Sequence, residues 1–253
     1  MSEEKLIHNE PERFGKLSII YQDEHLVAIN KPNRLLVHKT RIAEEKHFFA
    51  NRLLADQIGC EVYPVHRIDR ATSGVLLFAY SPQGVAMTQS LFMKGEVMKE
   101  YLAVVRGFVA ETGSTNESLV KHETGVEQTA LTDYERLNTV EVAISVNKYP
   151  TSRYSLVRML PRTGRTHQLR RHFNHMGHPI VGDTKYGDLR HNRMFEREWG
   201  ITSLLLHAHK LTFIHPFSTQ EVRLQAPLSP DFVKAMDTFA WVNNYKNFNP
   251  GLS

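Results

Sequence analysis

The sequence predicts an α+β fold in which helices pack on a mixed, mainly antiparallel sheet. Segments with strand character follow one another directly as often as they alternate with helical segments, which favours this class. The chain lacks both the dinucleotide glycine fingerprint and the phosphate-loop pattern, which argues against a doubly wound nucleotide-binding fold. With 253 residues, of which 41% are hydrophobic, the chain is long enough to bury a substantial core.

The N-terminal segment begins with a polar stretch. Residues 1–13 are expected to form a flexible tail, and residues 14–253 a single domain, because no linker divides them. Residues 17–32, LSIIYQDEHLVAINKP, place a polar turn between two apolar runs and predict a hairpin. Residues 43–58 have apolar side chains at helical spacing, and Gly59 provides a stop signal.

A strand, a helix and a second strand are expected next. The continuous apolar run SGVLLFAY, residues 73–80, predicts a strand covered on both faces. Ser81 and Pro82 mark the N-cap and the first residue of a helix that extends to about Phe92. Residues 99–107, KEYLAVVRG, predict a strand that ends at its glycine.

The second half repeats this mixture of elements. Residues 111–129 are rich in Thr, Glu, Ser and Gly and predict a surface excursion, followed by a strand in RYSLVRML, residues 153–160. A helix is expected after Thr166, its proposed N-cap, and a strand in SLLLHAHKLTFI, residues 203–214. The buried stripe of that helix is predicted to comprise Leu169, Phe173 and Met176.

The composition of the chain indicates which class of partner it binds and in which cellular compartment it is expected. The formal net charge is +4, and 14 histidines could add charge near a polyanion, which favours a nucleic acid as partner. No apolar run approaches the ~20 residues of a membrane span, and the N-terminus lacks the pattern of a signal peptide. Cys60 stands alone, so neither a disulfide framework nor a thiolate metal site is expected. We expect a cytoplasmic protein without a membrane partner.

An unusual charge pattern occurs in VHRIDRATSG, residues 65–74. Asp69 lies between Arg67 and Arg70, with His66 nearby, directly before the predicted buried strand. One interpretation is a structural ion pair in a turn. The other is that flanking cations keep Asp69 ionised for chemistry on an anionic substrate.

A second basic segment is PRTGRTHQLRRH, residues 161–172. A turn at Thr163 and Gly164 leads into a helix start surrounded by arginines, an arrangement that binds anions. A solvated basic helix face would have the same pattern. Together with HRIDR in a basic chain, the segment favours contact with nucleic-acid phosphate.

Three histidines and Tyr101 are weaker candidates for functional residues. His172, His175 and His178 recur at every third position, but Gly177 is expected to end the helix before His178, so a metal site is not favoured. Tyr101 in the strand KEYLAVVRG is, by itself, more typical of a half-buried packing residue than of a catalytic one. We therefore expect neither a metal nor a cofactor.

Taken together, the motifs resemble those of the RluA-type pseudouridine synthases. The motif HRIDRATSG is similar to the catalytic motif of that family, and the other motifs follow in the family's order over most of the chain. One departure is Arg34, which stands where the family's first motif has glycine, and which would be strained if that turn needs a positive φ. The further similar motifs are NKPNRLLVH (30–38), KEYLAVVRG (99–107), TGRTHQLRRH (163–172), GHPIVGDTKYGD (177–188) and LLLHA (204–208).

The resemblance implies the pseudouridine synthase fold, with a central RNA-binding cleft, and a role for each matching residue. Asp69 would be the catalytic carboxylate, Tyr101 the residue against the uracil, and Arg165 the partner of the aspartate. Arg67 would enter the RNA stack beside a flipped base, and Leu206 would pack on the uracil, although Leu205 is adjacent. The remaining arginines expected to bind RNA phosphate are Arg70, Arg170 and Arg171.

Details such as YPTSRY, RRHFNH and GDLRHNR are most similar to family members that act on tRNA. The resemblance therefore implies isomerisation of a uridine in tRNA, at position 65, by a protein that is a monomer and needs no protein partner. Three alternatives remain at this stage: the same chemistry on ribosomal RNA, a catalytically silent RNA-binding protein of this fold, and a metal hydrolase.

Overall fold

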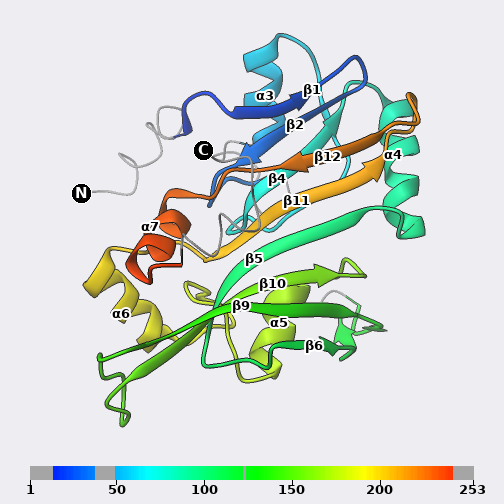
Figure 1. Ribbon diagram of the computed structural model, residues 1–253. Coiled ribbons are helices and arrows are strands. Elements are labelled where there is room, and N and C mark those ends of the chain that lie inside the picture. The colour runs from blue at the N-terminus through cyan, green and yellow to red at the C-terminus, as the bar shows by residue number, and fades with distance from the viewer. Residues whose placement is uncertain (1–13, 38–48, 122–123, 242–253) are drawn as a thin grey trace. The chain divides into compact units, whose positions relative to one another are not determined.

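The computed structural model describes residues 14–37, 49–121 and 124–241 (Figure 1). The α+β prediction is confirmed, since these residues form five helices and a mixed, mostly antiparallel sheet. The chain divides into two compact units: unit 1 comprises Met1–Met98 and Ala208–Pro227, and unit 2 comprises Lys99–His207 and Leu228–Ser253. The expected tail, residues 1–13, lies outside the described residues.

Strands of unit 1 lie in the order β1, β2, β4, β11, with β12 beside β11 and the short β3 beside β4. The predicted hairpin is confirmed, because β1 and β2 pair antiparallel across a turn closed by Asp23. The strands are β1 (Ser18–Gln22), β2 (Leu26–Lys31), β3 (Tyr63–Pro64), β4 (Ser73–Ala79), β11 (Leu206–Ile214), which starts in unit 2, and β12 (Glu221–Gln225).

Helices cover both faces of the β4 strand. Leu76 and Phe78 pack with Leu54 of α3 (Ala50–Ile58), whereas the alternate residues Val75 and Leu77 pack with α4 (Pro82–Lys94). All seven residues of β4 are consequently buried, as the continuous apolar run predicts.

The predicted ends of these helices are also confirmed. The Oγ of Ser81 accepts a hydrogen bond of 3.1 Å from the backbone N–H of Gly84, and Pro82 is the first residue of α4. Gly59 ends α3 in a left-handed conformation, with φ +76°. The expected N-terminal part of that helix, residues 43–48, lies outside the described residues.

Unit 2 contains an antiparallel sheet in the order β5, β10, β9, β6. Both predicted strands, in 99–107 and 153–160, are present, and the expected surface excursion contains three short strands. The elements are β5 (Met98–Arg106), β6 (Thr112–Thr115), β7 (Leu119–Val120), β8 (Glu127–Gln128), β9 (Thr132–Val142) and β10 (Ser152–Pro161).

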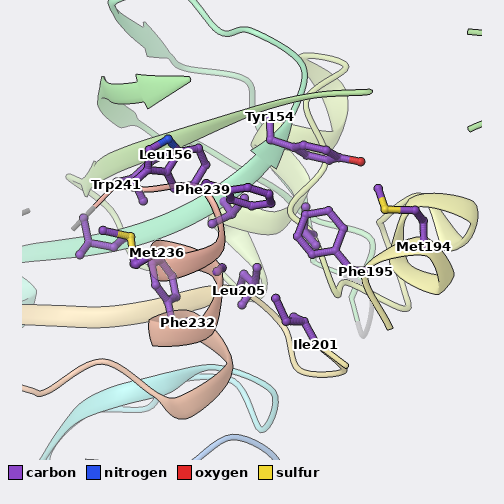
Figure 2. Close-up of a cluster of buried hydrophobic side chains, with 14 of the residues drawn as sticks. Tyr154, Leu156, Met194, Phe195, Ile201, Leu205, Phe232, Met236, Phe239 and Trp241 are labelled. Carbon is purple, nitrogen blue, oxygen red and sulfur yellow. The ribbon is translucent and has the colours of Figure 1, made fainter. Parts of the chain in front are cut away.

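The core of unit 2 is an aromatic cluster (Figure 2). Phe195 of α6 (Leu189–Trp199) and Phe232 of α7 (Pro230–Thr238) contribute to it together with Leu205. Phe239 and Trp241 follow α7, and the indole N–H of Trp241 donates to the carbonyl of Thr139 at 3.3 Å. Because these rings bury large apolar areas, they fix the C-terminal helix on the sheet.

Two glycines stand where strands or loops approach closely. Gly74 has φ +111°, and a Cβ there would lie 2.1 Å from the carbonyl oxygen of Ala208 on β11. Gly182 has φ +81°, and its Cβ would lie 2.1 Å from the carbonyl oxygen of Ser203. Gly74 belongs to the Thr-Ser-Gly that follows Asp69, so this glycine lets β4 approach β11 directly beside the candidate catalytic turn.

In the part of the chain that the structure describes, none of the helices has the length and apolar character needed to cross a membrane.

Candidate active site

Asp69 lies in a turn between β3 and β4 of unit 1. The backbone N–H of Thr72 donates to the carbonyl of Asp69 at 3.0 Å, which closes this turn. Ile68 is buried and Asp69 half-buried, whereas Arg67 and Arg70 are exposed. The apolar side chain of Ile68 therefore anchors the turn, and the half-buried Asp69 lies between two exposed arginines in the sequence.

The loop after β2 holds this turn in place. The Nδ2 of Asn33 donates to the carbonyl of Ala71 at 2.6 Å. In the opposite direction, the Nε of Arg70 donates to the carbonyl of Arg34 at 3.0 Å. The Nζ of Lys31 donates to the carbonyl of Arg70 at 3.2 Å. Three hydrogen bonds thus join the two segments immediately after Asp69.

Arg34 has φ +70°, so the turn does need the left-handed conformation that glycine adopts freely. The concern raised by the sequence is therefore justified: a residue with a Cβ occupies a strained position. Its carbonyl nevertheless accepts the hydrogen bond from Arg70, so the turn that carries Asp69 depends on this backbone geometry.

Lys31 is fully buried at the end of β2, which the sequence analysis did not predict. Burial lowers the pKa of Lys31 from 10.5 to about 7, against the opposing effect of the Asp69 carboxylate; the charge of Arg70 lowers it further. A signal was present in the sequence, since a lysine closes the strand LVAINK directly after an apolar run and Asn30. Its significance depends on neighbours almost forty positions away.

Tyr101 and Leu206 belong to unit 2. Tyr101 is half-buried in β5, opposite Met159 of β10. Leu205 packs in the aromatic core, where Figure 2 shows it near Phe232. Leu206 is the first residue of β11, is buried and is not part of that cluster, and its contact with a base stays a prediction.

Arg165 lies in the loop before α5 (Gln168–His175), and hydrogen bonds order this loop. The Nε of Arg165 donates to the carbonyl of Thr129 at 3.0 Å, and its backbone N–H donates to the Oε1 of Gln168 at 3.0 Å. The Nζ of Lys99 donates to the carbonyl of Thr163 at 3.0 Å. Burial lowers the pKa of Lys99.

The expected N-cap of this helix is wrong. His167, not Thr166, occupies that position, with φ +55° and without a capping hydrogen bond from its side chain. The side chain of Gln168 instead orders the preceding loop, because its Oε1 accepts from the backbone N–H of Arg165 and from the hydroxyl of Thr163. The predicted buried stripe is confirmed for Leu169 and Phe173, while Met176 is only half-buried.

The prediction that Arg170 binds RNA phosphate is corrected by the structure. Its side chain is buried, and its Nε and one terminal nitrogen donate to the two carboxylate oxygens of Asp183 at 2.7 and 2.8 Å. Burial would raise the pKa of Asp183, but hydrogen bonds from Arg170 and from the backbone of Tyr186 and Lys185 outweigh it and lower the pKa. Arg170 is therefore a structural ion-pair residue rather than a surface cation for RNA phosphate.

Arg171, by contrast, is half-buried, and a terminal nitrogen donates to the carbonyl of Val120 at 3.0 Å. This bond occupies only part of its donor capacity, since a guanidinium has five N–H groups. Arg171 remains a candidate for phosphate contact.

Two of the three regularly spaced histidines, His172 in α5 and His178 beyond its end, have other partners. The Nδ1 of His172 lies 3.0 Å from the Oγ1 of Thr132, and its Nε2 lies 3.0 Å from the carbonyl of Glu117. The Nδ1 of His178 lies 2.9 Å from the carbonyl of Arg106. Across the described ranges, no group of three or more His, Cys, Asp or Glu side chains is arranged to hold a metal ion.

Comparison with known proteins then decides the family. Residues 25–175, well over half of the chain, match the model of the family described as RNA pseudouridylate synthase. The chain belongs to the RNA pseudouridylate synthase family. It is consequently an isomerase, and the motif containing Asp69 falls within the matched region.

Individual members of the RNA pseudouridylate synthase family support this assignment. The chain is 43% identical to tRNA pseudouridine synthase C of Pasteurella multocida, over 89% of this chain and 97% of the relative. It is 42% identical to the protein of that name from Vibrio vulnificus, over 89% and 96%. The solved structure of human RNA pseudouridylate synthase domain containing 4 superposes with a TM-score of 0.69 and 25% identity, covering 88% of this chain and 93% of that one.

Proposed function

We propose that this enzyme converts a specific uridine in tRNA to pseudouridine, with Asp69 as the catalytic carboxylate. The observation that carries this proposal is the turn at Asp69, which a network of hydrogen bonds fixes while Arg67 and Arg70 remain exposed beside it. Preference for tRNA is supported by the names of the two bacterial relatives, which match nearly the whole chain.

The reaction rearranges bonds within one nucleotide. The bond between N1 of uracil and C1′ of ribose breaks, the base rotates, and a bond forms between C5 and C1′, after which C5 loses its proton and N1 gains one. Electrons balance without an oxidant or an energy source. An ionised Asp69 could start this sequence by attacking C1′ or by removing a proton from C2′, and both routes need the carboxylate charge.

The substrate must first leave the RNA stack. A stacked base cannot rotate, so the uridine has to be flipped out at a cost of a few kcal/mol. We assign Arg67 to the space the base vacates and Leu206 to packing against the uracil. Tyr101 is assigned to contact with the ring and to accepting the C5 proton, and Arg165 to pairing with the catalytic carboxylate.

The charge of the protein supports a polyanionic RNA as its partner. A net charge of +4 and the exposed Arg70, together with Arg171, suit a polyanionic partner. We also propose that the protein acts in the cytoplasm, where tRNA is available, as a monomer without a protein partner. Electrostatic contacts of this kind predict that RNA affinity falls steeply as salt rises.

The decisive test compares pseudouridine maps of RNA from cells with and without the protein. The proposal predicts that one tRNA position, with position 65 the first to examine, loses its pseudouridine and regains it when the wild-type chain is restored. Loss confined to ribosomal RNA would assign the same chemistry to a different substrate. Identical maps would contradict the proposed activity in the cell.

A further inference from the structure

A cavity of about 420 Å³ opens in unit 2, between the last residue of β5, the segment after α5 and the start of α6. Its volume lies within the range of about 300–1,000 Å³ that is typical of ligand sites. Most such sites are mainly apolar, whereas half of the residues that line this cavity have charged or amide side chains. These four are Arg106, Asn174, Asp188 and Arg190. The lining therefore suits a charged group better than an apolar molecule.

The carboxylate of Asp188 lies between the two arginines of the cavity. The Nη1 of Arg106 donates to its Oδ2 at 2.6 Å, and the Nε of Arg190 lies 3.5 Å from its Oδ1. That Oδ1 also accepts the backbone N–H of Arg190 at 3.0 Å and so caps α6. Burial would raise the pKa of Asp188, but this backbone hydrogen bond and the surrounding positive charges outweigh it and lower the pKa. An ionised Asp188 thus holds both guanidinium groups at the cavity.

Both guanidinium groups keep donors for a further acceptor, since each has five N–H groups. Arg106 uses its Nη1 for Asp188, and its Nη2 lies 3.4 Å from the carbonyl of Gly177. The Nε of Arg190 lies beyond the usual hydrogen-bond distance from Asp188. The side chains of Arg106 and Arg190 are 36% and 58% exposed, so a ligand can reach them. Two cations and one carboxylate leave the lining with a net positive charge.

Two sequence motifs that the proposed chemistry does not use meet beside this cavity. They are YPTSRY, residues 149–154, and GDLRHNR, residues 187–193. The hydroxyl of Tyr154 lies 2.6 Å from the Nδ1 of His191. Burial lowers the pKa of His191 against the opposing charge of Asp188, so its ring is neutral when it makes this bond. The bond ties α6 to β10 and keeps the start of α6 in place before a ligand binds.

The cavity lies apart from the residue assigned to the uracil. Tyr101 and Arg106 belong to the same strand, β5, and five residues at about 3.3 Å each separate them by roughly 16 Å. An RNA bound at Tyr101 has phosphates at such a distance, because every nucleotide of the strand carries one. Guanidinium groups suit phosphate, whose oxygens can accept two N–H bonds from one arginine.

We propose that this cavity binds a backbone phosphate of the tRNA, outside the flipped nucleotide, through the guanidinium groups of Arg106 and Arg190. This inference rests on the proposed function, because it takes tRNA as the RNA that lies against Tyr101. The cavity adds affinity for the substrate and takes no part in the rearrangement of bonds.

The test compares Arg190→Gln with Arg197→Gln in full-length tRNA binding over a range of salt concentrations. Arg197 is exposed on the same helix, roughly 10 Å further along α6, and is not among the residues that line the cavity. We expect Arg190→Gln to lose roughly 3- to 10-fold in affinity and about 0.7–0.9 in the slope of log affinity against log salt. Arg197→Gln should match the wild type. Equal losses in the two variants would indicate diffuse surface charge, and no loss in Arg190→Gln would leave the cavity without a phosphate; either result would overturn the inference.

Phosphate ethylation interference locates the contact on the tRNA. With the wild type, we expect at least one phosphate outside the target nucleotide whose ethylation weakens binding. That phosphate should no longer interfere with Arg190→Gln, whereas phosphates beside the target uridine should interfere with both proteins. Arg190→Lys keeps the charge but lacks the fork, so it should retain the salt slope and recover part of the affinity. The same interference pattern in wild type and Arg190→Gln would contradict the proposal.

Thermal melting with inorganic phosphate separates a tRNA contact from a site for a free anion. If phosphate raises the melting temperature of the wild type but not of Arg190→Gln, while both proteins bind tRNA equally, the cavity serves a small anion and the proposal is wrong. A wild-type protein that binds tRNA but forms no pseudouridine would overturn the proposed function and leave this inference standing, because its readouts are binding measurements. A wild-type protein that does not bind tRNA would overturn both.

Discussion

Arg34 illustrates how one residue can be tolerated in a conformation that suits glycine. At φ +70°, a side chain costs roughly 1–2 kcal/mol, because its Cβ crowds the neighbouring carbonyl oxygen. The sequence identified the position through its resemblance to a glycine-containing motif. The hydrogen bond that explains why the turn keeps this shape, from Arg70 to the Arg34 carbonyl, is visible only in the structure.

The strain at Arg34 predicts a difference between two substitutions that both remove its side chain. Arg34→Gly should be more stable than Arg34→Ala by about 0.5–1 kcal/mol, because alanine retains the Cβ while glycine loses somewhat more entropy on folding. Urea unfolding of both variants measures this difference. Equal stabilities, or a more stable alanine variant, would show that the position is not strained.

Arg170 shows where interpretation of the sequence failed. Four arginines within residues 161–172 predict a basic surface, and nothing local distinguishes the one that turns inward. Its partner, Asp183, lies thirteen positions later, beyond the end of the helix. A buried pair of this kind depends on tertiary packing, which local periodicity does not encode.

Opposite consequences are therefore expected for adjacent arginines. Arg170→Ala leaves the Asp183 carboxylate buried without its main partner and should destabilise the fold by about 3–5 kcal/mol. Arg171→Ala should cost less than about 1 kcal/mol, but should reduce the slope of log affinity for RNA against log salt by about 0.7–0.9 if its side chain contacts a phosphate. Chemical unfolding and salt titrations of both variants test this, and a slope change in folded Arg170→Ala alone would contradict the assignment.

Lys31 also makes stability depend on pH. Its pKa falls from 10.5 in the unfolded chain to about 7 in the folded protein, so the unfolded state binds more protons between these values. Relative to Lys31→Met, the wild type should therefore gain stability as pH rises above about 7, by at most about 1.4 kcal/mol per pH unit. Urea unfolding of both proteins between pH 7 and 9 measures the gain. A difference that stays constant with pH would mean that the lysine keeps an ordinary pKa.

Among the secondary-structure elements, those with strong local signals were predicted well. The continuous apolar run of β4 and the Ser81–Pro82 start of α4 identify their elements because burial on both faces and capping both leave direct sequence patterns. The start of α5 was misplaced by one residue. His167 adopts a left-handed conformation there and makes no capping hydrogen bond with its side chain, so the usual Ser or Thr signal does not apply.

For the whole molecule, the division into two units could not be predicted from composition. The chain passes between the units inside β5, inside β11 and after Pro227, and at the first two places, within strands, a linker signal cannot occur. The expectation of a single domain from residue 14 onward stays a prediction. Asp69 and Lys31 belong to unit 1, whereas Tyr101 and Arg165 belong to unit 2.

The proposed chemistry requires no metal ion. Breaking and remaking a glycosidic bond through a carboxylate needs only the carboxylate and a proton acceptor, so exhaustive chelation should leave the rate of pseudouridine formation in tRNA unchanged. Chelator is removed by dialysis before the assay, and magnesium is returned to preserve the fold of the tRNA. A loss of activity that only zinc restores would revive the alternative of a metal-dependent enzyme.

The central claim is that Asp69 acts as a charged catalytic group. Asp69→Asn keeps the shape of the side chain but removes its charge, and Asp56→Asn, at an exposed position on α3, is the matched control. Proton release from C5 of uridine in tRNA is the most direct measurement, made with binding and melting curves on the same preparations. We predict that Asp69→Asn folds and binds tRNA like the wild type but loses at least about 10²–10⁴-fold in rate, whereas Asp56→Asn retains full activity. Substantial turnover by folded Asp69→Asn would contradict the account.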